Sequence, residues 1–229
     1  MLSTAAQNKI FSRFCGTNLR KSLHENLALE DLKYLIDSEI VFSSVIYIDI
    51  FDFSNKIAGS TTVKVRDYLN DYYSTAMPII QSYGGQIDKI MGDGIIVVFS
   101  RIFPNLETDR NAVDNSFYCC KELIETFYDT EFEAKSAIGI GDLYFCKTGV
   151  EQIYEENTAL GHPMTIAYRL ENIANKNQIL IMSDTKLAQR IENSQYNLQY
   201  WSRSSNTVSL KGVNSKEIKV LKYLGQGNT

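Results

Sequence analysis

The sequence feature that most constrains the fold is an apolar run that carries an acid near its end. Residues 41–51 (VFSSVIYIDIF) are dense in β-branched and aromatic side chains, which are typical of a buried β-strand. Asp49 lies inside this run, where a carboxylate without a partner is costly. The run therefore predicts a buried strand whose acid takes part in an interaction.

The patterns that follow this strand predict a β-α-β-β-α-β order with trailing strands. Apolar residues at helical spacing favour helices over 61–83, 106–129 and 164–175. Gly92-Asp93-Gly94 separates two apolar runs and indicates a tight hairpin. A strand pair broken near Gly141 is expected at 137–147, and short strands at 178–182, 198–201, 208–210 and 218–224. We therefore expect an α+β fold with helices on one face of a largely antiparallel sheet.

Composition limits the partners and the compartment. We expect a helical extension over residues 1–40 and one domain over 41–229. Lys and Arg total 23 against 27 Asp and Glu, so no basic excess supports nucleic-acid binding. No apolar run is long enough to span a membrane, and residues 1–14 lack the apolar segment of a signal peptide. The four cysteines show no metal-binding spacing, and we expect a cytoplasmic protein.

Asp49 and Asp93 are candidate metal ligands. One lies near a strand end and the other at a hairpin tip, and such positions converge when the strands are neighbours. Paired carboxylates are hard oxygen ligands suited to Mg²⁺ or Mn²⁺. The polar loop after Asp49 enters a helix, whose first amides are free to bind phosphate. The alternative is structural, with Asp93 as a turn residue and Asp49 as a strand-end cap.

Five segments, in this order, resemble motifs of the class III nucleotidyl cyclases. The resemblance covers roughly residues 40–224. The segments are residues 49–54 (DIFDFS), 89–93 (KIMGD), 137–141 (AIGIG), 160–170 (LGHPMTIAYRL) and 210–212 (LKG). The resemblance implies a ferredoxin-like βαββαβ core and a head-to-tail homodimer with shared active sites. It also implies a nucleoside triphosphate substrate that is cyclised with loss of pyrophosphate.

The same resemblance assigns roles to individual residues. Two divalent cations, Mn²⁺ or Mg²⁺, would be held by Asp49, Asp93 and the Ile50 carbonyl. Arg169 of the partner chain would stabilise the phosphate in the transition state, because its planar fork donates two bonds and stays charged. Thr165 stands where the family has an asparagine that helps to hold the ribose. The triphosphate would be bound by Phe51, Phe53, Ser54 and Lys211.

The expected base pocket departs from both purine patterns. Lys89 occupies the position where adenylate-forming members carry a lysine, but Thr158 replaces the aspartate that accepts the exocyclic amine. Asp52 also replaces a glycine of the first motif. This combination, in a short chain, resembles the Pycsar pyrimidine cyclases of bacterial anti-phage defence, which make a cyclic nucleotide for a separate effector.

The resemblance favours UTP over CTP as the substrate. Three alternatives stay open. The first is an adenylate cyclase, and the second is a degenerate cyclase-like domain that binds nucleotide without turnover. The third is a diguanylate-type synthase, prompted by residues 84–88 (GGQID) but lacking the acidic pair of that class.

Overall fold

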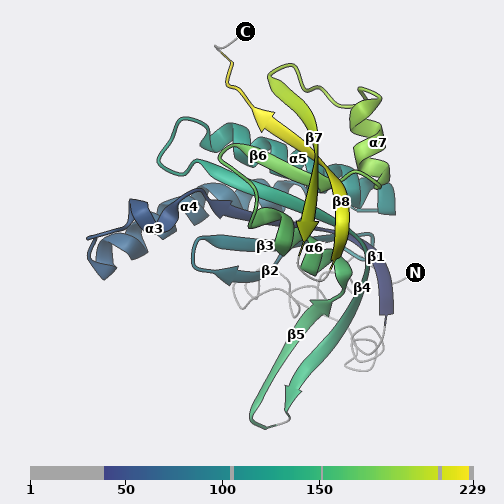
Figure 1. The fold of residues 1–229 in the computed structure, drawn as a ribbon. Helices are drawn as coiled ribbons and strands as arrows, with labels where there is room; N and C mark the ends of the chain where they lie inside the picture. Colours follow the sequence, from purple (N-terminus) through teal and green to yellow (C-terminus); the bar gives the residue numbers. More distant parts are fainter. Residues whose placement is uncertain (1–38, 104–105, 151, 211–212, 227–229) are drawn as a thin grey trace.

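The computed structural model describes residues 39–103, 106–150, 152–210 and 213–226, and Figure 1 shows their arrangement. Most of the predicted N-terminal extension, residues 1–38, and the predicted phosphate ligand Lys211 lie outside the described residues.

One sheet of eight strands organises the described residues. Its order is β2-β3-β1-β4-β6-β8-β7, and β5 pairs with the far half of β4. All pairs are antiparallel except β4 with β6. The strands are β1 Glu39–Ile50, β2 Gln86–Met91, β3 Gly94–Ser100, β4 Ala134–Val150, β5 Tyr154–Leu160, β6 Gln178–Met182, β7 Trp201–Leu210 and β8 Val213–Tyr223.

Five helices connect these strands. They are α3 Phe53–Lys56, α4 Thr62–Ser82, α5 Asp109–Phe127, α6 His162–Glu171 and α7 Lys186–Glu192. Thr61 caps α4 by accepting the Lys64 amide, and Gly84, at φ 72°, follows its end as expected for a helix C-terminus. The elements β1, α4, β2, β3, α5 and β4, in the sheet order β2-β3-β1-β4, form the predicted ferredoxin-like βαββαβ core. None of the helices within the described ranges is long and apolar enough to cross a membrane.

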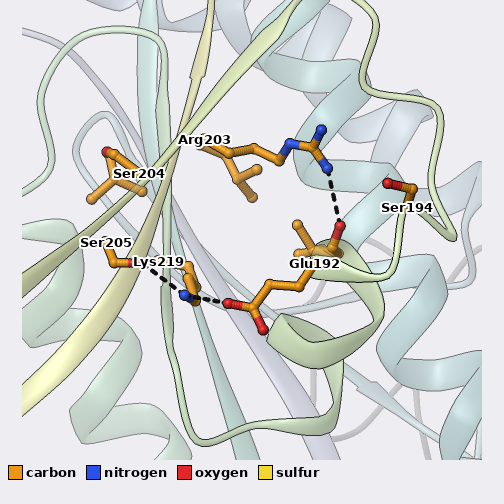
Figure 2. Close-up of a pocket in the computed structure, with 9 residues that line it drawn as sticks. Glu192, Ser194, Arg203, Ser204, Ser205 and Lys219 are labelled. Atoms are coloured by element: carbon orange, nitrogen blue, oxygen red, sulfur yellow. Dashed lines mark hydrogen bonds and ion pairs between the residues drawn. The ribbon is translucent and has the colours of Figure 1, made fainter.

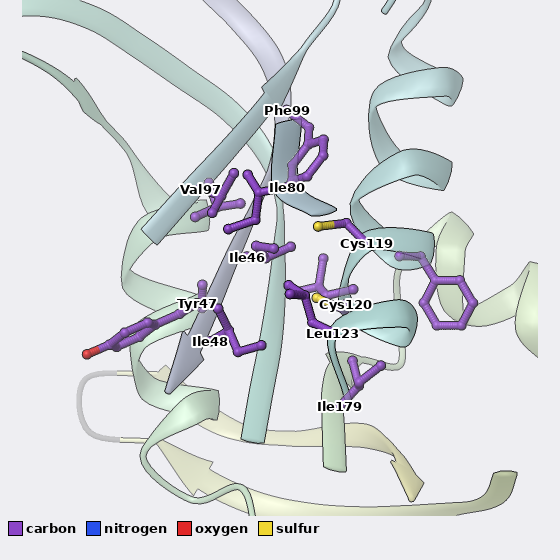
Figure 3. Close-up of a cluster of buried hydrophobic side chains, with 14 of the residues drawn as sticks. Ile46, Tyr47, Ile48, Ile80, Val97, Phe99, Cys119, Cys120, Leu123 and Ile179 are labelled. Atoms are coloured by element: carbon purple, nitrogen blue, oxygen red, sulfur yellow. The ribbon is translucent and has the colours of Figure 1, made fainter. Parts of the chain in front are cut away.

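Helices cover both faces of the sheet, so the expectation of a single covered face is wrong. Ile46 and Ile48 of β1 point towards Cys120 and Leu123 of α5, in the main hydrophobic core (Figure 3). Tyr47 points to the opposite face, where it stacks on Tyr168 of α6 with ring centroids 5.8 Å apart. Successive side chains of a strand alternate between faces, so the apolar run serves two different environments.

The strand predictions are wrong at β4. The expected break near Gly141 does not occur, because Gly141 adopts φ 150°, pairs with Ser43 and lets one strand run to Val150. The hairpin turn comes later, before the unpredicted strand β5. This hairpin projects away from the rest of the sheet (Figure 1).

Three further boundaries differ from the sequence predictions. The predicted helix 164–175 ends at Glu171, and α7 was not expected. The predicted strands 198–201 and 208–210 are not separate. A single strand, β7, runs from Trp201 to Leu210 and includes the end of the first and all of the second. The residues between them, SRSSNT, are polar and exposed, so no apolar alternation marks them as a strand.

Helix α6 docks on β4 by direct backbone contact. A Cβ atom on Gly139 would lie 2.0 Å from the carbonyl oxygen of Pro163, in the first turn of α6. At Gly161, the residue before the helix, a Cβ atom would lie 2.6 Å from the Asp142 carbonyl oxygen. Both positions therefore require glycine, and the spacing between helix and strand is fixed by the backbones.

Candidate active site

The register of β1 and β3 brings Asp49 and Asp93 together. Ile48 pairs with Ile95, so Asp49 lies beside the β2–β3 turn that carries Asp93. The two carboxyl groups lie close enough for Asp93 to raise the pKa of Asp49. From the other side, the Tyr73 hydroxyl of α4 donates to the Gly92 carbonyl and holds the tip of the hairpin. The predicted convergence of the two acids is therefore present in the fold.

The surroundings of Asp49 favour its neutral form when no cation is bound. Burial raises the pKa of the Asp49 carboxyl well above its usual range, and the adjacent Asp93 adds to the shift. Like charges at this spacing cannot both ionise cheaply unless a cation lies between them. A bound divalent cation would relieve this repulsion between the two carboxylates.

The donor set fits Mg²⁺ or Mn²⁺. Both side chains supply carboxylate oxygens, and the carbonyl of Ile50, the last residue of β1, lies next in the chain. Among the described residues, no cluster of three or more His, Cys, Asp or Glu side chains is arranged to hold a metal ion. A cation at this pair would therefore keep open coordination positions for water or substrate oxygens.

The loop after β1 has the geometry of a tight turn into a helix. Asp52 adopts the left-handed conformation (φ 61°), which explains why the corresponding motif position is usually glycine. The Asn55 side-chain amide donates to the Asp52 carboxylate at 2.7 Å. Aspartate tolerates this conformation better than most residues, so the substitution preserves the turn.

The predicted phosphate-binding amides differ in their availability. Phe53 and Ser54 lie in the first turn of α3, where backbone N–H groups have no partner inside the helix. The Phe51 amide instead donates to the Glu133 carbonyl oxygen at 2.8 Å. A phosphate role for Phe51 therefore requires this bond to be exchanged, whereas Phe53 and Ser54 need no such change.

Thr165 and Arg169 lie on the outer side of α6. They are four residues apart and so share one side of the helix, whereas Ile166, Leu170 and Glu171 are buried. Thr165 is exposed and Arg169 is half-buried. Within the described part of the chain, the Arg169 guanidinium makes no hydrogen bond or ion pair. Its charge is therefore available to a ligand or to another chain.

The two predicted base-binding residues come from different parts of the sheet. Lys89 is half-buried on the edge strand β2, directly after an irregularity that shifts the register between Ile87 and Lys89. Such irregularities commonly re-aim a side chain beside a binding site. Thr158 is only 2% exposed on β5, where it pairs with Cys146 of β4. In the sheet order, β3 and β1 separate β2 from β4.

An open groove of about 320 Å³ lies at the other edge of the sheet, between α7 and the β7–β8 hairpin (Figure 2). The two basic side chains that line this groove already have partners in the protein. Lys219 pairs with Glu192 and donates to Ser205, and Arg203 donates to the Ile191 carbonyl oxygen. This groove is far from the paired carboxylates in the sheet order and contributes nothing to their chemistry.

Comparison with known proteins identifies the fold. The adenylyl cyclase CyaB from P. aeruginosa superposes with a TM-score of 0.65 at 20% identity, over 84% of this chain and 100% of that chain. The guanylyl cyclase Cya2 superposes with a TM-score of 0.61 at 22% identity, over 84% of this chain and 97% of that chain. The fold is that of the nucleotidyl cyclase catalytic domain.

A curated relative is similar in sequence to part of this chain. The terminal-differentiation specific adenylate cyclase of Dictyostelium discoideum is 30% identical over 153 residues, which is 65% of this chain. The chain spans only 7% of the length of that relative. No family model matches the sequence.

Sequence reasoning missed three residues that surround Asp49 in this cyclase fold. Tyr47 is two residues before Asp49 and shares its face, which the strand alternation alone predicts. Lys135 of β4 lies opposite Asp49 in the register, and it forms an ion pair of 2.8 Å with Glu171 of α6. The contacts of Lys135 with Asp49 and Glu171 join segments that are far apart in the chain, so no local pattern in the sequence reveals them.

Proposed function

We propose that this protein is a nucleotidyl cyclase, which converts a nucleoside triphosphate into a 3′,5′-cyclic mononucleotide and pyrophosphate. The observation that carries this proposal is the pairing of Asp49 with Asp93 at the end of β1 in a cyclase fold. The first-turn amides of α3 support it, because the helix begins four residues after Asp49.

The reaction needs few protein groups. The ribose 3′-oxygen attacks the α-phosphorus, the bond to the bridging oxygen of the β-phosphate breaks, and the 3′-hydroxyl proton passes to solvent. Divalent cations, which Asp49, Asp93 and the Ile50 carbonyl would hold, would acidify that hydroxyl and neutralise the charge of the leaving pyrophosphate. The amides of Phe53 and Ser54 orient the terminal phosphates.

The active site is proposed to be shared between two chains. Arg169, which has no partner among the described residues, and the exposed Thr165 project from the outer side of α6, away from the side that packs on the sheet. In a head-to-tail dimer they would reach the carboxylates of the partner, where Arg169 stabilises the charge that develops on the phosphate. Thr165 would contact the ribose.

A pyrimidine triphosphate, UTP in preference to CTP, is the proposed substrate. The supporting observation is that Thr158 stands in place of a carboxylate, and its hydroxyl is a weaker acceptor for the amino group of a base. Uracil presents carbonyl acceptors that the Lys89 ammonium can satisfy. The cyclic product would then act as a second messenger on a separate effector, in the manner of anti-phage signalling.

Adenylate cyclase activity is the second candidate. Lys89 is the lysine expected of an adenine-reading site, and both the curated relative and CyaB are described as adenylate-forming enzymes. The two candidates share the carboxylates, Arg169 and the chemistry. The two candidates differ only in the nucleotide base that Lys89 and Thr158 would bind.

Product analysis separates these candidates. Purified protein is incubated with Mn²⁺ and, in separate reactions, with ATP, GTP, CTP or UTP, and the products are identified by mass. Asp93→Asn removes one carboxylate charge, and Asp67→Asn makes the same change at an exposed position of α4 as a matched control. Cyclic UMP or cyclic CMP, lost in Asp93→Asn but not in Asp67→Asn, supports the pyrimidine proposal.

Two other outcomes decide against it. Cyclic AMP as the main product selects the adenylate candidate. If no triphosphate is cyclised although Mn²⁺ and nucleotide bind, the protein is a binding domain and the cyclase proposal is wrong.

A further inference from the structure

A third carboxylate and a cation lie on the same face as Asp49. Glu171, the last residue of α6, is only 3% exposed. The Lys135 ammonium of β4 lies 2.8 Å from one of its carboxylate oxygens, and the two side chains are 17% and 4% exposed. A buried carboxylate needs such a partner, because removing its charge from water is costly.

The charges of this pair act on the candidate metal site. Lys135 lies directly opposite Asp49 in the β1–β4 register, so their Cβ atoms are close neighbours on the sheet. Glu171 raises the pKa of Asp49 and of Tyr47, whereas Lys135 lowers that of Asp49. The carboxylate site is therefore part of a cluster of four charges formed by Asp49, Asp93, Glu171 and Lys135.

We propose that Lys135, held in place by Glu171, is a counter-ion that sets how strongly the Asp49–Asp93 site binds a divalent cation. Once a cation binds and all four groups are ionised, three negative charges and one positive charge give the cluster a net charge of −2. Without Lys135 the net charge is −3, and the cluster attracts a divalent cation at the Asp49–Asp93 pair more strongly.

This role rests on the proposed function and adds a regulatory consequence to it. With Lys135 present, the nucleotide-free protein binds the cation only weakly. The cation arrives together with the triphosphate, whose own negative charges outweigh the effect of the lysine. Lys135 is thus a positioning residue that makes metal binding depend on substrate.

Mn²⁺ binding to the nucleotide-free protein tests the proposal, with free Mn²⁺ measured by electron paramagnetic resonance. Lys135→Met leaves a net charge of −3 and is expected to bind Mn²⁺ about tenfold more tightly, the order expected for one unit charge near a divalent ion at a half-buried site. Glu171→Gln leaves −1 and is expected to bind about tenfold more weakly. The double variant returns to −2 and to the affinity of the unmodified protein.

A purely structural pair gives a different result. If the pair only fastens α6 to β4, both single variants lose stability and both weaken Mn²⁺ binding. Changes in the same direction, or no change, overturn the proposal. Lys135→Arg keeps the charge and should retain the original affinity, and Lys219→Met removes a lysine from another ion pair at the far edge of the sheet and should change nothing.

Two further comparisons keep the test decisive. If Lys135→Met does not fold, weakening in Glu171→Gln and its reversal in the double variant still decide it. Asp49→Asn separates this proposal from the proposed function. If Mn²⁺ binding survives that change, the metal site itself is wrong. If binding is lost but the two single variants do not diverge, only the role of Lys135 is wrong.

Discussion

The two faces of β1 differ in chemistry although they alternate residue by residue. Ile46 and Ile48 point into the apolar layer beneath α4 and α5 (Figure 3). Tyr47 and Asp49 lie on the opposite face under α6, beside buried charges. The first face supplies stability through packing, and the second holds carboxylates that cost stability unless a ligand arrives. One strand therefore joins a well-packed apolar face to a face whose buried carboxylates repel each other.

Asp93→Asn breaks the chemical face and should have the largest effect. Losing one carboxylate of the pair removes several kcal/mol of transition-state stabilisation, so cyclase turnover should fall at least about a thousandfold. The fold should remain, since the change relieves repulsion with Asp49. Turnover by product mass and melting by circular dichroism check both statements. Full turnover in Asp93→Asn would exclude the carboxylate pair as the reaction centre.

Arg169→Ala tests the outer side of α6. Turnover should fall by about 10²–10³-fold, the usual loss for one preorganised charge donor. If the site is shared, mixing Arg169→Ala chains with Asp49→Asn chains gives heterodimers with one complete site. An equal mixture should recover about a quarter of the unmodified activity. Tyr118→Phe, at an exposed tyrosine of α5, is a control for a surface change outside the proposed site. No recovery in the mixture contradicts a shared site.

Ile48→Ala breaks the packing face instead. Ile48 is fully buried, and its truncation should lower the free energy of unfolding by about 2–5 kcal/mol. Urea denaturation measures this loss. Turnover at a temperature where the variant is folded should stay within a few fold of the original. A large loss of turnover without loss of stability would mean that the two faces are not separate in function.

The sequence predicts the parts of this comparison that depend on local patterns. The run 41–51 identifies β1, and the Gly-Asp-Gly tip identifies the hairpin that carries Asp93. The placement of Tyr47 and Asp49 on one face of β1 also follows from a local property, because the two residues are two positions apart in a strand. The pairing of Lys135 with Glu171 is not, because it depends on the register between β1 and β4 and on the docking of α6.

Other features escaped prediction for similar reasons. Strand β7 is polar and exposed over most of its length, so its pairing with β8 gives no apolar signal. A glycine within an apolar run often indicates a break in the strand. Gly141 nevertheless lies within β4, because its backbone conformation there suits glycine. The roles of Lys89 and Thr158 stay predictions, since they depend on a bound nucleotide.

The last prediction concerns pH and the metal-free protein. Because the pKa of Asp49 is raised by burial and by Asp93, its neutral form favours folding. That contribution is complete below the ordinary carboxyl pKa near 4 and is lost as pH rises towards the raised value. Between pH 5 and 8 the stability of the metal-free protein should fall by at most about 1.4 kcal/mol per pH unit relative to Asp49→Asn.

Urea denaturation at several pH values, in the presence of a chelator, measures this difference. Added Mn²⁺ should reduce it, because the cation stabilises the charged form. Parallel pH profiles for the two proteins would show that Asp49 is not the group responsible.

The backbone contact between Gly139 and Pro163 has a consequence for how such a protein can evolve. Since α6 cannot shift on β4 without a collision or a gap, the position of Arg169 is inherited with the fold rather than maintained by surrounding side chains. In the proposed site, substitutions at Thr158 and Thr165 can then accumulate while the helix stays in place. If these residues contact the nucleotide as proposed, such a scaffold lets a lineage change the nucleotide it recognises in single steps, each of which passes through a folded intermediate.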